Sequence, residues 1–117
     1  MKIINHYFNN INKSIIYKIG KNALENDQII NEANENDIWF HISGSPSSHV
    51  IASVSNISLT KRELFTIIKR GALFCKENTK KFSSEKDVPI IYTKIKYITK
   101  TNIIGTVQTA NNKVIFL

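Results

Sequence analysis

The sequence contains few of the residues that mark secreted, membrane or disulfide-stabilised proteins. Its 117 residues include one Cys, two Pro, four Gly and one Trp. The single Cys75 allows no internal disulfide and is typical of a reducing compartment. No apolar run approaches the roughly 18 residues of a membrane span, and the N-terminus lacks the features of a secretory signal. We therefore expect a soluble, cytoplasmic protein without membrane association.

Arginine is scarce, whereas Ile, Asn and Lys dominate. This bias follows AT-rich codons and suggests an AT-rich source genome, such as that of a large DNA virus. The net charge of +7 is unevenly distributed. Residues 1–59 carry four Lys against five acidic residues, whereas residues 60–117 carry twelve Lys and Arg against four. This excess indicates either an anionic partner or a merely solubilising surface, and charge alone does not distinguish RNA, DNA and an acidic protein.

The centre of the chain, residues 37–49, holds the only Trp and two of the three His. Residues 39–42 and 50–54 have the β-branched and aromatic composition of strands. Gly44 and Pro46 between them favour a tight reversal. We expect a hairpin whose polar loop presents its side chains rigidly.

Two strands and a helix are expected before this hairpin. Residues 3–8 and 15–19 have strand composition and are joined by an Asn-rich turn. Asn22, with Glu25 three residues later, predicts a helix start of the capping-box type. The expected buried stripe of this helix is Leu24, Ile29, Ile30 and Ala33.

A second helix follows Thr60, which forms a Thr-x-x-Glu capping box with Glu63. We expect it to end near residues 80–83. Its predicted core face consists of Leu64, Ile68, Gly71, Ala72 and Cys75. Its predicted basic stripe on the opposite face consists of Arg62, Lys69, Lys76 and Lys80.

Residues 88–99 predict one long strand, with Pro89 tolerated at its start. Period two gives one face with an aromatic and several lysines, namely Tyr92, Lys94, Lys96 and Lys100. Such a face suits contacts to phosphates and bases, but it also protects an edge strand from aggregation. Two more strands, at 103–109 and 114–117, complete a single α+β domain with a mixed, largely antiparallel sheet and two main helices.

Patterns for catalysis or metal binding are weak. Ser48 and His49 are adjacent, but neighbours on an extended chain point to opposite faces and make a poor nucleophile–base pair. His6, His41 and His49 lack the tight spacing of zinc ligands, so we expect neither a metal nor a cofactor. The acidic residues between positions 25 and 37 suit helix capping as well as paired carboxylates.

The Gly20-Lys21-Asn22 turn leads directly into the first expected helix. A helix N-terminus exposes backbone N–H groups, and a lysine beside it strengthens the preference for an anion. An ordinary strand-to-helix turn has the same pattern, so both interpretations stay open.

Two segments form longer motifs: Gly20-Lys-Asn-Ala-Leu-Glu-Asn-Asp27 and Asp37-Ile-Trp-Phe-His-Ile-Ser-Gly-Ser-Pro-Ser-Ser-His-Val50. They resemble the G-(K/R)-N-x-x-E-N-D box and the D-x-W-F-H-x-x-x-x-P-(G/S)-S-H-V signature of the NFACT-R domain family. Tyr92-Thr93, Lys100 and Gly105-Thr-Val107 resemble its C-terminal pattern. The resemblance covers about residues 15–117. Ser47 departs mildly from the glycine that many relatives have there.

The resemblance implies an RNA-binding role. In larger relatives this domain accompanies an N-terminal NFACT domain and a coiled coil, and those proteins bind obstructed large ribosomal subunits and recruit tRNA for template-free tailing. We expect the standalone type, which is similar to the eukaryotic coiled-coil-domain proteins but here without the coiled coil. Tailing is therefore not carried over.

The resemblance also indicates particular RNA-binding residues. Lys21 and His49 are expected to contact the phosphate or ribose of the RNA. The expected RNA-binding residues are Lys21, Asn22, Asn26, Asp27, His41, Ser47, Ser48 and His49 in the motifs, and Arg62, Lys69, Lys76, Lys94, Lys96 and Lys100 on the basic faces. The residues expected to hold the loops in place are Gly20, Glu25, Asp37, Trp39 and Pro46.

We predict that residues 1–117 form one non-catalytic module that binds structured RNA, either tRNA or ribosomal RNA of the large subunit, in ribosome-associated quality control. DNA binding through the basic face stays open. One alternative is an enzyme that processes RNA or nucleotides through His41, Ser48 and His49. The other is a protein-interaction module that docks an acidic partner.

Overall fold

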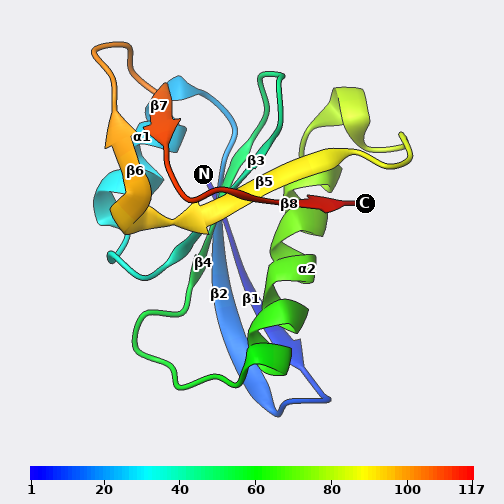
Figure 1. The fold of residues 1–117 in the computed structure, drawn as a ribbon. Coiled ribbons are helices and arrows are strands. Elements are labelled where there is room, and N and C mark those ends of the chain that lie inside the picture. The colour runs from blue at the N-terminus through cyan, green and yellow to red at the C-terminus, as the bar shows by residue number, and fades with distance from the viewer.

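The computed structural model describes residues 1–117 as a six-stranded sheet with two helices and a small separate sheet (Figure 1). The main sheet contains β1 (Lys2–Phe8), β2 (Lys13–Gly20), β3 (Ile38–Ile42), β4 (His49–Ser53), β5 (Pro89–Lys94) and β8 (Lys113–Phe116). The other elements are β6 (Ile98–Lys100), β7 (Val107–Thr109), α1 (Ala23–Glu32), α2 (Lys61–Glu77) and the 3₁₀ turns η1 (Lys80–Phe82) and η2 (Ile95–Tyr97). None of the helices combines the length and the apolar character that crossing a bilayer requires.

The strand order in the main sheet is β1-β2-β4-β3-β5-β8, and every neighbouring pair is antiparallel. The predicted α+β fold with a largely antiparallel sheet and two main helices is therefore confirmed. The central hairpin of β3 and β4 also forms as expected, and Gly44 in its loop has φ +75°, a conformation that glycine adopts readily.

The side chains of the sheet alternate between two hydrophobic layers. Phe40 of β3 and Val50 of β4 belong to the larger core under α2. Trp39 and Ile51 point to the opposite face and pack with Ile29 of α1 in a smaller cluster. Figure 1 shows α2 on one side of the sheet, with α1 and the β6–β7 hairpin on the other. The period of two along β3 thus separates the apolar core from a second, partly aromatic face.

The capping box at the start of α2 is present as predicted. The Thr60 hydroxyl accepts a hydrogen bond from the Glu63 N–H at 3.1 Å, and the Glu63 carboxylate accepts one from the Thr60 N–H at 2.9 Å. Four residues of the predicted core face are buried, Leu64 is only partly buried, and Ile67 and Phe74 are also buried. However, the helix ends at Glu77, so Lys80 lies in η1 and the basic stripe of α2 is shorter than expected.

The predicted buried stripe of α1 is wrong at Leu24, whose side chain is 71% exposed. Ile29 and Ile30 are buried as expected, and Ala33 packs partly buried against the same cluster. The inward position in the first turns is taken by Asn26, a polar residue that forms a hydrogen bond there. An apolar periodicity cannot identify a buried position that is occupied by an amide.

The predicted long strand at 88–99 is wrong beyond Lys94. The N–H groups of Ile95 and Lys96 donate to the carbonyl groups of Asp37 and Glu35, both at 2.9 Å, and the chain turns through η2. It then continues as β6, which pairs only with β7. Lys94, Lys96 and Lys100 therefore lie on three different elements and do not form one strand face.

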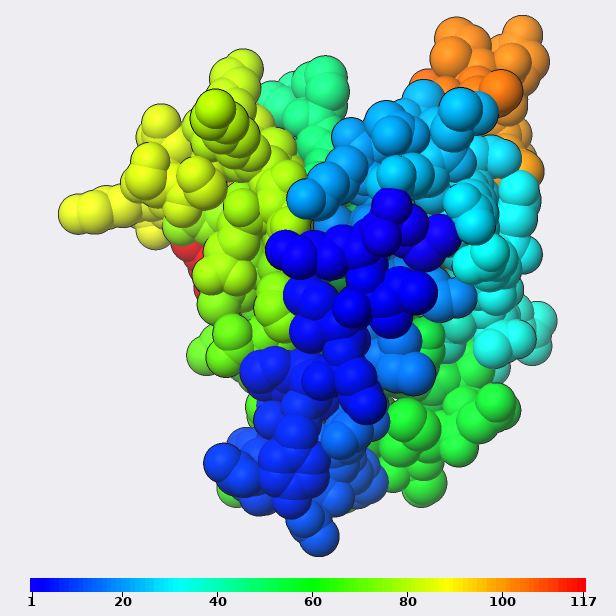
Figure 2. All heavy atoms as spheres, turned by 180° about the vertical axis from the view of Figure 1, so that it is seen from behind, coloured from blue at the N-terminus to red at the C-terminus, as the bar shows by residue number.

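The tip of the β6–β7 hairpin consists of residues 101–106, four of which are exposed. Figure 2 shows this tip (orange) projecting beyond α1 (cyan). Ile103 and Ile104 are 64% and 57% exposed there. The strand predicted at 103–109 is consequently shorter than expected, because only Val107–Thr109 pairs with β6.

The contact between α2 and β3 gives a test of core packing. A Cβ on Gly71 would lie 2.4 Å from Cζ of Phe40, whose ring is fully buried and cannot move aside freely. We expect Gly71→Ala to lower the free energy of unfolding in urea by about 1–3 kcal/mol. Lys69→Ala, on the exposed face of the same helix, should change it by less than about 0.5 kcal/mol. Equal effects of the two substitutions would contradict this packing.

Candidate functional site

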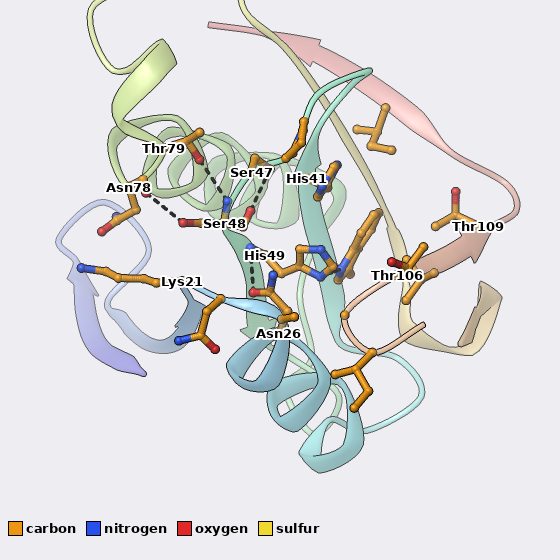
Figure 3. A pocket seen from close by; sticks show the side chains of 18 of the residues that line it. Lys21, Asn26, His41, Ser47, Ser48, His49, Asn78, Thr79, Thr106 and Thr109 are labelled. Carbon is orange, nitrogen blue, oxygen red and sulfur yellow. Dashed lines mark hydrogen bonds between the residues drawn. The ribbon is translucent and has the colours of Figure 1, made fainter. Parts of the chain in front are cut away.

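A cavity of about 690 Å³ opens where the two sequence motifs meet (Figure 3). Its wall is formed by the start of α1, the β3–β4 hairpin, the segment that follows α2, one residue of β5 and the β6–β7 hairpin. The lining residues are Lys21, Asn22, Ala23, Asn26, Trp39, His41, Pro46, Ser47, Ser48, His49, Asn78, Thr79, Lys80, Ile91, Ile104, Gly105, Thr106, Val107 and Thr109.

The side chain of Asn26 joins the two motifs. Its Oδ1 accepts a hydrogen bond from the backbone N–H of His49 at 3.3 Å, and the residue is buried. Gly20 pairs with His49 across the ladder between β2 and β4. A Cβ on Gly20 would lie 2.4 Å from Asn26 Oδ1, so only glycine leaves room for the amide to reach the second strand.

The first motif also organises the start of α1. The Asn22 side chain accepts a hydrogen bond from the Glu25 N–H at 2.9 Å and caps the helix. The Glu25 carboxylate turns back to the Lys21 N–H at 3.1 Å and to the N-terminal ammonium of Met1 at 2.7 Å. These two partners lower the pKa of Glu25. The Lys21 ammonium forms no ion pair and is exposed at the cavity rim.

Asp37 is a structural centre of the second motif, because its carboxylate is buried and accepts four hydrogen bonds. Oδ1 accepts from the N–H groups of Val54 at 2.9 Å and Ser55 at 3.0 Å, and from the Ser55 hydroxyl at 2.8 Å. Oδ2 accepts from the Asn34 N–H at 2.8 Å. This carboxylate therefore holds the chain before β3 against the end of β4.

The floor of the cavity is formed by Trp39, His41 and His49. The Trp39 indole N–H donates to Nδ1 of His49 at 3.1 Å. The rings of Trp39 and His41 are parallel, with centroids 5.5 Å apart, and the His49 ring meets His41 edge-on at 4.9 Å. Since an indole can only donate, Nδ1 of His49 carries no proton, and the neutral ring must carry its proton on Nε2.

Both histidines of this floor are neutral at physiological pH. Burial lowers the pKa of His49 to about 3, and the nearby His41 adds to this effect. Burial also lowers the pKa of His41. His49 therefore lacks the positive charge that a phosphate contact would use, and it offers a neutral hydrogen-bond donor instead.

The serines of the loop are committed to structural hydrogen bonds. The Ser48 hydroxyl donates to the Asn78 carbonyl at 2.8 Å, and its N–H donates to the Thr79 hydroxyl at 3.1 Å. The Ser47 hydroxyl accepts from the Ile42 N–H at 3.0 Å. The two bonds of Ser48 attach the β3–β4 loop to the end of α2, whereas the bond of Ser47 lies within the hairpin. No imidazole accepts from Ser48, so a nucleophile–base pair is not formed there.

The cavity brings together seven of the expected RNA-binding residues, which are Lys21, Asn22, Asn26, His41, Ser47, Ser48 and His49, together with Trp39 and Pro46 from the structural set. Asp27 lies outside and pairs with Lys100 at 3.2 Å. The remaining basic residues also lie outside, namely Arg62, Lys69, Lys76, Lys94 and Lys96. Lys69 borders a second cavity of about 500 Å³. No group of three or more His, Cys, Asp or Glu residues is placed to hold a metal ion.

Sequence reasoning missed part of the cavity wall. Asn78 and Thr79 follow directly after α2, at positions that the periodic pattern assigns to the helix. Thr106 lies between Gly105 and Val107, in a segment that the C-terminal pattern had already marked. Gly105 has φ +81°, and its absent side chain lets the hairpin approach Ala23, whose Cα would lie 2.7 Å from an added Cβ.

Comparison with known proteins identifies one family. The model described as "NFACT protein RNA binding domain" matches residues 4–110. No curated protein shows a significant match. Among solved structures, the C-terminal part of the fibronectin/fibrinogen-binding protein from Streptococcus suis is similar, with a TM-score of 0.76 and 22% identity. The match covers 97% of this chain but only 44% of that one, and at this identity it shows a shared fold.

The contact between the motifs can be tested at Gly20. Gly20→Ala would place a methyl group against Asn26 Oδ1 and break the hydrogen bond to His49. We expect a loss of about 1–3 kcal/mol in the free energy of unfolding and a shifted His49 amide resonance. Ser43→Ala, at an exposed site in the β3–β4 loop, should leave both measurements nearly unchanged. A wild-type His49 amide resonance in Gly20→Ala would refute the contact.

The neutral state of His49 predicts a pH dependence of stability. The folded chain resists protonation of His49 down to about pH 3, whereas the unfolded side chain titrates near 6.5. Because the unfolded state then binds more protons, stability falls as the pH drops below 6.5, by at most about 1.4 kcal/mol per unit from this group. Urea unfolding at pH 7 and pH 5 should show a larger decrease for wild type than for His49→Gln. The same decrease in both proteins would contradict the assignment.

Proposed function

Since the chain belongs to the family of NFACT protein RNA-binding domains, we propose that it binds structured RNA, either tRNA or ribosomal RNA, without catalysing a reaction on it. Membership of the family implies RNA binding in a general sense. The identity of the RNA and the residues that contact it are the subject of the proposal.

The convergence of the two motifs on one cavity is the observation that carries this proposal. The motifs are separate in sequence, yet Lys21 and Asn22 from the first and Ser47 to His49 from the second line the same wall. Lys21 and Lys80 are exposed at this cavity and form no ion pair. Uncommitted ammonium groups beside a polar cavity suit contact with the phosphates that flank a bound nucleotide.

The exposed basic residues outside the cavity extend this electrostatic footprint. Arg62, Lys69, Lys94 and Lys96 are exposed and form no ion pair, whereas Lys100 is partly neutralised by Asp27. Phosphate contacts of this kind position a nucleic acid without reading its sequence. We propose that they contribute affinity, while the cavity contributes selectivity.

The hydrogen bonds at the loop favour binding over catalysis. Ser48 donates to a backbone carbonyl, and His49 is bonded through Nδ1 to Trp39. Neither group is therefore arranged as a nucleophile with its base. Nuclease treatment distinguishes RNA binding from a protein-interaction role of the basic face. It should release the partners of this chain if RNA connects them, and should leave a direct protein partner bound.

The biological context that we propose is quality control of translation at the large ribosomal subunit, in the cytoplasm. The resemblance of the two motifs to those of the larger relatives motivates this context. The chain covers only 44% of the similar solved chain. We do not extend the proposal to tailing of stalled polypeptides. Duplex DNA is a competing ligand that the basic surface could also bind, and the following experiment includes it.

The proposal is tested by binding of labelled tRNA, duplex DNA and heparin at low and at physiological salt. Lys21→Ala/Lys80→Ala removes the two free ammonium groups of the cavity and should weaken tRNA binding about tenfold. Lys61→Ala/Lys86→Ala removes the same charge at exposed positions outside the cavity and should weaken it much less. All affinities should decrease with salt, because binding releases counterions.

The comparison between ligands decides the outcome. Preference for tRNA, reduced only by the pair of substitutions at the cavity, supports the proposed function. Equal binding to all three polyanions, weakened equally by both pairs of substitutions, would reduce the interaction to non-specific electrostatics and overturn it.

A further inference from the structure

The floor of the cavity bears one hydrogen-bond donor that the protein leaves unused. His49 is 3% exposed, and its Nδ1 accepts from Trp39, so Nε2 carries the proton of the neutral ring. No group of the protein accepts a hydrogen bond from Nε2. Every fully enclosed side-chain nitrogen and oxygen has a partner, so Nε2 must open into the cavity that His49 lines. A donor that faces a cavity and has no partner in the protein can donate to a ligand that carries an acceptor.

A flat surface lies beside this donor. The rings of Trp39 and His41 are parallel, and His41 remains partly exposed on the cavity side (Figure 3). A planar aromatic ligand could continue this stack over His41. Because burial keeps both histidines uncharged, the surface suits a neutral heteroaromatic ring better than an anion.

The remaining walls supply polar groups that also lack a partner within the protein. The hydroxyl groups of Thr106 and Thr109 line the side opposite the loop and make no hydrogen bond within the protein (Figure 3). Lys21 and Lys80 stand at the exposed side of the cavity. A volume of about 690 Å³ lies within the range of small-molecule sites, so it accommodates a single nucleotide but not a base-paired helix.

We infer that the cavity receives one unpaired nucleobase of the bound RNA. The His49 Nε2–H donates to an acceptor on the edge of the base, the base stacks on His41, and Lys21 and Lys80 contact the flanking phosphates. This inference rests on the proposed function and specifies that the bound RNA offers an unpaired base. A paired base is stacked between its neighbours, so the site selects loops, bulges or ends over a continuous duplex.

The single Trp of the chain makes occupancy of the cavity directly measurable. Trp39 lines the cavity, stacks on His41 and donates a hydrogen bond to His49, the two residues that the proposed base contacts. Titration with a stem–loop RNA should change Trp39 emission and saturate, whereas a blunt duplex of the same stem should bind without that change. The stem–loop should also bind at least about tenfold more tightly than the duplex, the size of effect expected from one stacked base.

Two substitutions in the β6–β7 hairpin distinguish the effect of a negative charge inside the cavity from its effect outside the cavity. Thr106→Glu places a carboxylate in the cavity wall and should weaken the stem–loop about tenfold while affecting the duplex only slightly. Gln108→Glu adds the same charge two residues away, at an exposed position that does not line the cavity. It should leave the preference for the stem–loop and the change in Trp39 emission intact.

The outcomes distinguish this inference from the proposed function. Binding of the stem–loop without a change in Trp39 emission, or an unchanged preference in Thr106→Glu, overturns the cavity as a base site and leaves RNA binding in place. Failure of both RNAs to bind overturns the two proposals together. Saturable emission change that is lost only in Thr106→Glu establishes the site.

Discussion

The hydrogen bond from the His49 N–H to the Asn26 side chain is the contact on which the cavity depends. It links the first turns of α1 to the start of β4, so that two residues 23 positions apart in sequence bring the two motifs to one wall. The bond requires that Gly20 have no side chain, because the amide occupies the space of its Cβ. The glycine, the amide and the backbone N–H thus act as one unit.

In the proposed site, selectivity and electrostatic attraction are assigned to different parts. At the floor, burial keeps His41 and His49 uncharged, and the Trp39 indole determines which nitrogen of His49 donates. At the rim, the side chains of Lys21 and Lys80 are exposed and form no ion pair. A neutral interior discriminates by shape and hydrogen-bond pattern, whereas exposed charge acts over a longer range and is screened by salt. The arrangement avoids the large cost of burying an unpaired cation.

Much of the fold could be predicted from the sequence, because local signals agreed with the tertiary structure. The capping box at Thr60, the reversal at Gly44 and the strand composition around Trp39 each appear where expected. The failures share one cause. Asn26 is buried to serve a distant backbone group, and the chain turns after Lys94 because Ile95 bonds to the Asp37 carbonyl. Such long-range hydrogen bonds leave no trace in periodicity. Most of the expected motif residues line one cavity, whereas the expected basic residues of α2, β5, η2 and β6 lie outside it.

The β6–β7 hairpin stands apart from the ladder of the main sheet, and this has an evolutionary consequence. Its strands pair only with each other, and its tip touches α1 where Gly105 meets Ala23. Substitutions at Thr106 or in the exposed tip therefore alter one wall of the cavity while the hydrogen bonds of β2, β3 and β4 stay intact. With the cavity as the proposed binding site, natural selection could change which ligand is bound by altering a few residues of the hairpin, without first having to compensate for a weakened core.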